Sequence, residues 1–222
     1  MKTVFVDVDV QHDFCDPSGA LFVAGADALA GAFRALTARA VERGRMIVGS
    51  VDSHAFDAWE FAGAPVAGPS GERPGFPPHC VKGTAGWLKA PGTMTARARF
   101  VPNAPLSPEA LAAAARENAP TQLLLEKEVY SLFANPNAEA LLELLTEGEA
   151  ARFVVYGVAT DYCVKAACEG LLRWATSRGR GEVWLVTDAV AAVVAADGDR
   201  AIQACEAAGV RLVRVADALE AA

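Results

Sequence analysis

The alternation of short apolar runs with helical patterns most constrains how this chain can fold. The apolar runs, rich in Val, Ile, Leu and Phe, predict six β-strands, at residues 3–8, 46–52, 122–127, 152–158, 182–188 and 210–215. Helical patterns are expected between them, over residues 27–43, 137–147, 161–177 and 198–208. Nearly continuous apolar strands that alternate with helices are typical of a parallel sheet buried on both faces. We therefore expect an α/β three-layer sandwich, Rossmann-like, with a central, mostly parallel six-stranded sheet.

Length and charge narrow the classes of function. The 222 residues favour one domain, 1–222, with a long Pro- and Gly-rich loop region at 53–105 that we expect to bind metal and substrate. The net charge is -7, and the absence of a basic cluster argues against nucleic acid and anionic membranes as partners. No apolar run reaches the ~20 residues of a membrane span, and the N-terminus resembles a strand more than a signal peptide. We expect a cytoplasmic protein, and the five cysteines fit a reducing compartment.

Four chemically capable side chains fall at the ends of predicted strands. Asp9, Asp52 and Lys127 end three of them, and Cys163 follows a fourth. Ligands of parallel α/β sheets bind at the carboxyl ends of the strands. We therefore expect these side chains to meet at one edge of the sheet.

Each of the three candidate catalytic residues has a functional and a structural interpretation. Cys163 would lie in a first helical turn, whose N–H groups stabilise a thiolate or an oxyanion, but it could also be an ordinary buried cysteine. Asp9 could be a general base with a pKa raised by burial, although Asp7 or Asp9 could instead bond a neighbouring loop. Lys127 could be a buried ammonium that keeps the thiolate and carboxylate charged, or a solvated ion pair at a strand end.

Candidate metal ligands occur in and before the loop region. Asp52 and His54 form a DxH pair, and His79 follows two prolines. Asp57 or Glu60 could complete the set, and such ligands suit one divalent ion of zinc, manganese or iron. Taken alone, this set of candidate ligands is only a weak indication of a metal site.

Six short segments together resemble the nicotinamidase/pyrazinamidase branch of the isochorismatase-like cysteine hydrolases. They occur in the order and spacing of that family and span the chain. The segments are DVQHDF (9–14), GAL (19–21), VDSH (51–54), PPHCVKGTAG (77–86), EKEVYSLF (126–133) and GVATDYCV (157–164).

The resemblance implies a catalytic centre. Cys163 attacks the carboxamide carbon, Asp9 transfers the thiol proton to the departing ammonia, and Lys127 supports the charged pair. Backbone N–H groups of Ala159 and Cys163 form the oxyanion hole, with a cis peptide between Val158 and Ala159. The acyl-enzyme is a thioester that water opens.

The resemblance also implies a metal that anchors the pyridine nitrogen of the substrate. Asp52, His54 and His79 hold this metal. Many nicotinamidases carry another histidine after the DxH pair, and here Glu60 is the first substitute and Asp57 the second. The implied substrate-binding residues are Phe14 and Phe76, which sandwich the ring, together with Val158 and Tyr162.

The leading hypothesis is hydrolysis of nicotinamide to nicotinate and ammonia, a step of NAD salvage. The expected partner is a small-molecule amide substrate, and a homo-oligomer is an open possibility. The first alternative is a metal-independent amidohydrolase of the same superfamily that acts on a carbamoyl or ureido substrate. The second is a catalytically silent binding module, which the three catalytic residues disfavour. Vinyl ether hydrolysis of the isochorismatase type is disfavoured because it does not need the cysteine.

Overall fold

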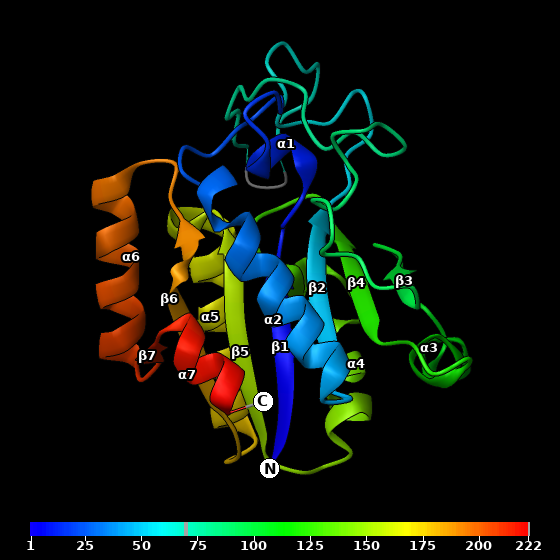
Figure 1. Ribbon diagram of the computed structural model, residues 1–222. Coiled ribbons are helices and arrows are strands. Elements are labelled where there is room, and N and C mark those ends of the chain that lie inside the picture. The colour runs from blue at the N-terminus through cyan, green and yellow to red at the C-terminus, as the bar shows by residue number, and fades with distance from the viewer. Residues whose placement is uncertain (69–70, 222) are drawn as a thin grey trace.

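The computed structural model describes residues 1–68 and 71–221 and contains a parallel sheet (Figure 1). Its seven strands are β1 (Lys2–Val8), β2 (Met46–Asp52), β3 (Ala98–Val101), β4 (Gln122–Lys127), β5 (Ala151–Val158), β6 (Glu182–Ala191) and β7 (Arg211–Val213). They lie in the order β3-β4-β2-β1-β5-β6-β7, and every neighbouring pair is parallel. The α/β fold with a parallel sheet is confirmed.

The prediction of six strands is wrong, because β3 lies within the region expected to be a loop. This strand has four residues, and only Val101 among them is buried. It pairs with β4 alone, at an edge of the sheet. A half-buried edge strand of this length carries no clear alternation of apolar and polar residues. The strand expected at 210–215 is also shorter, because a helix begins at Val215.

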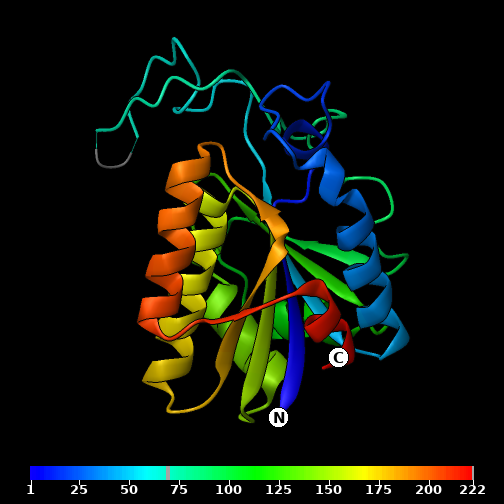
Figure 2. The same ribbon diagram turned by 60° about the vertical axis from the view of Figure 1, so that its left-hand side comes forward.

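The helices cover both faces of the sheet (Figure 2). Four agree with the expected helices: α2 (Ala30–Glu42), α4 (Ala138–Thr146), α5 (Lys165–Ser177) and α6 (Ala195–Ala208). The sequence patterns did not predict the other three, α1 (His12–Cys15), α3 (Pro108–Arg116) and α7 (Val215–Glu220). The remaining turns are 3-10 helices η1 (Asp27–Leu29) and η2 (Leu132–Ala134), and a π-helical turn η3 (Thr160–Val164).

Two apolar cores hold the three layers together. One contains side chains of α3, α4, α5 and α6, such as Leu141 and Leu171, packed on one face of the sheet. The other contains side chains of α1, α2 and α7, such as Phe33 and Ala218, on the opposite face. The central strands β1, β2 and β5 contribute side chains to both cores, which explains why their sequences are nearly continuous apolar runs.

The long loop region lies over the carboxyl ends of the strands, together with α1 (Figure 1). At this edge β1 lies between β2 and β5, so the chain connections diverge to either side of β1. Such a switch point leaves a crevice in which α/β proteins bind ligands. Of residues 1–68 and 71–221, no helix combines the length and the apolar character that crossing a bilayer requires.

Candidate active site

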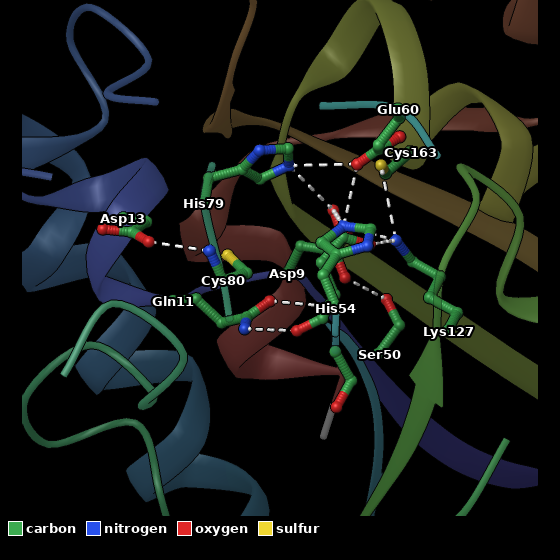
Figure 3. A network of polar contacts seen from close by, with 12 residues as sticks. Asp9, Gln11, Asp13, Ser50, His54, Glu60, His79, Cys80, Lys127 and Cys163 are labelled. Carbon is green, nitrogen blue, oxygen red and sulfur yellow. Dashed lines mark hydrogen bonds and ion pairs between the residues drawn. The ribbon is translucent and has the colours of Figure 1, made fainter. Parts of the chain in front are cut away.

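Asp9, Lys127 and Cys163 meet at the switch point (Figure 3). Asp9 follows β1, Lys127 ends β4, and Cys163 lies in η3 directly after β5. Lys127 Nζ lies 2.8 Å from Asp9 Oδ2 and 3.6 Å from Cys163 Sγ. The three side chains are buried, so Lys127 is not the solvated ion pair that the sequence left open. Their grouping is what strand-end placement predicts.

Asp9 is fixed by its backbone and by β2. Its φ of 48° is in the left-handed region, which aspartate tolerates better than most residues. Its backbone N–H donates to the carbonyl of Ser50 at 3.1 Å, and Ser50 Oγ donates to Asp9 Oδ1 at 2.8 Å. The sequence reasoning missed Ser50, although a serine inside a strand expected to be buried was a usable signal.

Burial governs the proton on Cys163. It raises the pKa of this thiol well above its ordinary value, and although the Lys127 ammonium opposes the rise, Asp9 adds to it. Desolvation of the sulfur thus favours the thiol form, so attack by Cys163 calls for a base nearby.

Asp9 is placed to be that base. A carboxylate oxygen of Asp9 lies within 4.8 Å of Cys163 Sγ, and hydrogen bonding between the two side chains contributes to the pKa of each. Burial raises the pKa of Asp9, while the Lys127 ammonium opposes the rise. A pKa that moves from the usual carboxyl range toward neutrality suits a general base.

Lys127 and Asp52 form the charged centre of the site. Burial alone would lower the pKa of Lys127, but the carboxylates of Asp52 and Asp9 hold it well above its ordinary value. Burial would raise the pKa of Asp52, but Lys127 and His54 hold it well below. Lys127 Nζ donates to Asp52 Oδ1, so the ammonium joins two carboxylates.

The other oxygen of Asp52 belongs to a group of possible metal ligands. Ligand atoms of Asp52, His54 and His79 all lie within 4.8 Å of one another. Glu60 Oε1 lies 2.8 Å from His54 Nε2 and 3.3 Å from His79 Nε2. These four buried side chains present two imidazole nitrogens and two carboxylate oxygens toward one another, as Figure 3 shows for the two histidines and Glu60.

This donor set fits a divalent cation. His54 Nε2 faces the Glu60 carboxylate at 2.8 Å, and its other ring nitrogen, Nδ1, is buried without a hydrogen-bond partner among the described residues. His79 Nδ1 lies 2.9 Å from the carbonyl oxygen of Pro77, which favours the tautomer that leaves Nε2 free to bind a metal. Burial would lower the pKa of His54, but Asp52 and Glu60 raise it to about 9, so the group attracts positive charge.

The structure distinguishes the two carboxylates proposed as a fourth ligand. Glu60 is buried against both histidines, whereas Asp57 is exposed. Phe76 N–H donates to the carbonyl of Glu60 at 2.9 Å, and the neighbouring Phe61 forms a bridge with Phe76. This local pairing fixes the backbone from which the Glu60 side chain reaches the two histidines.

A pocket that is partly open to solvent connects the sulfur to the metal-ligand group. Phe14, Phe76 and Tyr162, which we expect to bind substrate, line it together with Ala159 and Cys163. The sequence reasoning missed several further lining residues, namely Leu21, Val23, Val129, Tyr130 and Val193. The segments GAL and EKEVYSLF contain three of them and were the available signal.

Val158 does not reach the pocket wall. Its side chain is fully buried in the apolar core on the α2 side of the sheet. The peptide bond between Val158 and Ala159 is cis, as the resemblance implies. Before it, Gly157 has a φ of 126°, and a Cβ there would lie 2.0 Å from the carbonyl oxygen of Val8. Only glycine allows β5 to approach β1 this closely.

Buried polar contacts attach the loop region to the sheet. Lys89 Nζ pairs with Asp7 at 2.7 Å, so Asp7 rather than Asp9 is the carboxylate that bonds a loop. Asp13 accepts the N–H of Cys80 at 2.7 Å and thereby holds the residue after His79. Gln11 joins the backbone of Asp52 to that of Trp87.

Comparison with known proteins identifies relatives of this chain. A family model described as the isochorismatase domain matches residues 3–217. The nicotinamidase/pyrazinamidase of Mycobacterium tuberculosis is 33% identical over 168 residues, which cover 75% of this chain and 76% of that protein.

Solved structures give the same result for the fold. The pyrazinamidase of Pyrococcus horikoshii in complex with zinc is 25% identical, with a TM-score of 0.69 over 96% of this chain and 99% of that chain. PnC1 from L. infantum in complex with nicotinate is 24% identical, with a TM-score of 0.70 over 97% of this chain and 93% of that chain.

Proposed function

The chain belongs to the isochorismatase family of hydrolases, and we propose that it hydrolyses nicotinamide to nicotinate and ammonia. The observation that carries this proposal is that one pocket holds both Cys163 and the buried Asp52, Glu60 and His79. A pyridine carboxamide has an electrophilic carbon at one end and a ring nitrogen at the other. Such a ligand matches a pocket with a nucleophile at one end and a metal-ligand group at the other.

The reaction proceeds through a thioester. Asp9 takes the proton from Cys163 Sγ as the sulfur bonds to the carboxamide carbon, and N–H groups of Ala159 and Cys163 bind the developing oxyanion. Asp9 then gives the proton to the departing nitrogen, and ammonia leaves. Water, deprotonated by Asp9, opens the thioester to release nicotinate and regenerate the thiol. Lys127 compensates the negative charge that passes between sulfur and carboxylate.

Asp52, His54, His79 and Glu60 would hold one divalent ion. Such an ion would supply a Lewis-acid contact for the ring nitrogen of the substrate. The paired nitrogen and oxygen donors suit zinc, manganese or iron. Asp52 divides its two oxygens between this group and Lys127, so it sets the spacing between substrate anchor and nucleophile.

The pocket favours a neutral substrate over the ureido acids of the alternative hypothesis. Within the described part of the chain, its lining contains no lysine or arginine, and its two acids are Asp52 and Glu60. A ureido acid carries a carboxylate, which requires a cationic partner when it is buried. Nicotinamide needs no such partner, and the rings of Phe14 and Phe76 supply apolar surface for it.

Ammonia release distinguishes the candidate functions. Purified protein of measured metal content should release ammonia from nicotinamide and not from N-carbamoyl amino acids. The Cys163→Ala variant should keep its circular dichroism spectrum and lose the activity. Ammonia from the ureido acids alone would support the alternative substrate. No ammonia from either, together with unreactive Cys163, would support a binding module.

A further inference from the structure

Asp161 joins the nucleophile turn to a neighbouring connection. It lies in η3, two residues before Cys163. Its two carboxylate oxygens accept the backbone N–H groups of Val193 at 3.0 Å and Val194 at 2.9 Å. These two residues connect β6 to α6, at the same end of the sheet as α1 (Figure 1).

The contact places a negative charge at the start of α6. Val194 is the N-cap residue of α6, and Asp161 accepts its N–H and that of the residue before it. The helix dipole favours a negative charge at this end of a helix. Asp161 provides such a charge from a different element, so the position of α6 depends on η3.

Close packing supports the same connection. A Cβ at Gly198, in the first turn of α6, would lie 2.4 Å from Cβ of Ala192 and 3.7 Å from Cβ of Thr160. The helix start therefore lies directly against the turn that carries the nucleophile. A shift of residues 192–194 cannot occur without moving this contact.

Val193 is also part of the pocket wall. It lines the pocket with Tyr162, Tyr130 and Cys163, and it is 52% exposed because it lies at the mouth. The rings of Tyr130 and Tyr162 are 5.2 Å apart between centroids. Asp161, which precedes Tyr162 in the chain, thus holds the backbone of Val193, a second residue of the same pocket wall.

We propose that Asp161 is a positioning residue that holds Val193 against the pocket mouth and so limits the size of the amide that reaches Cys163. It does not touch the reacting atoms. The nature of the substrate rests on the proposed function, but the geometry of the mouth does not.

Asp188 offers a matched control for the structural part of this role. Its carboxylate accepts the backbone N–H of Val215 at 2.7 Å and Nε of Arg214 at 3.0 Å, at the start of α7. It therefore makes the same kind of contact at a helix N-terminus, and it is absent from the described lining of the pocket. Removing either carboxylate should destabilise the start of a helix. Only the removal of Asp161 should also change the width of the pocket mouth.

The test compares Asp161→Ala, Asp161→Asn and Asp188→Ala. We expect Asp161→Ala to raise KM for nicotinamide up to about tenfold with a smaller change in kcat, because Val193 loses the charged acceptor that holds it in the pocket wall. The asparagine variant keeps one acceptor oxygen and should lie between wild type and Asp161→Ala. Asp188→Ala should lower Tm and leave KM unchanged.

A second measurement does not depend on turnover. Alkylation of Cys163 by iodoacetamide and by bulky N-phenylmaleimide is followed by peptide mass spectrometry. The measured quantity is the rate of Cys163 alkylation by N-phenylmaleimide divided by the rate with iodoacetamide. This ratio should rise about fivefold in Asp161→Ala and stay constant in Asp188→Ala. Equal ratios and equal KM values in both variants would overturn the proposal. If wild type does not hydrolyse nicotinamide, the proposed function fails, and the alkylation ratio still decides the role of Asp161.

Discussion

Replacing Lys127 with methionine removes the ammonium between Asp9 and Asp52 with little change of volume. The Lys127–Asp9 attraction at 2.8 Å is about 6 kcal/mol at an effective dielectric constant of ~20, and desolvation of the charges offsets part of it. Breaking a buried pair from one side costs roughly 3–5 kcal/mol. For a domain of this size each kcal/mol lowers Tm by about 2–4 °C, so we expect a fall of about 6–20 °C.

The stability that Lys127→Met loses should depend on pH. Lys127 opposes the rise in the pKa of Asp9, so without it burial and Asp52 raise this pKa further. A carboxyl whose pKa is higher folded than unfolded binds more protons in the folded state between those two values. Stability therefore falls as pH rises from about 4, the unfolded value, toward the folded pKa. The deficit of Lys127→Met should be small in acid and largest near neutrality.

Urea unfolding at several pH values measures this deficit. The double variant Asp9→Asn with Lys127→Met should recover part of the stability, because one unpaired carboxylate is gone, but no activity. Ammonia release should fall about 100-fold or more in Lys127→Met, since protonated Asp9 cannot accept the thiol proton. A deficit below about 1 kcal/mol that does not change with pH would refute the assignment of Lys127 as the counter-charge of the site.

Three further predictions concern the supports of the site. Ser50→Ala should lower kcat/KM about tenfold and move the acidic limb of its pH profile to higher pH, because Asp9 loses a hydrogen bond to its charged form. An acidic limb at the wild-type pH would count against this role of Ser50. Glu60→Gln should lower zinc occupancy after equilibrium dialysis at least tenfold, while Asp57→Asn, at an exposed position, should not; equal occupancy in both would exclude Glu60 as a ligand. Gly157→Ala should yield little soluble protein, because its Cβ would lie 2.0 Å from a β1 carbonyl oxygen; wild-type yield and Tm would contradict this.

The strand-end rule predicted the grouping of Asp9, Asp52, Lys127 and Cys163, because parallel strands deliver their carboxyl ends to one edge. It could not predict Ser50, whose partner Asp9 is 41 residues away in the sequence. The rise in the pKa of Cys163 could not be predicted from the sequence either, since burial of a single sulfur depends on the packing of several elements.

Short elements at the periphery were harder to predict than the core. β3 has four residues at an edge and lies beyond a Pro- and Gly-rich stretch, so its apolar pattern is too short to separate it from a loop. The choice between Glu60 and Asp57 depended on the bridge between Phe61 and Phe76, which joins two parts of the loop region. Such pairings between irregular segments leave no periodic signal.

The central claim is that Cys163 carries the acyl group. Rapid acid quench of wild type during turnover of nicotinamide, followed by peptide mass spectrometry, tests it directly. We predict a nicotinoyl thioester on the peptide that contains Cys163, which hydroxylamine removes and which is absent from Cys163→Ala. Steady ammonia release without any adduct on Cys163, or with the adduct on another cysteine, would contradict the account.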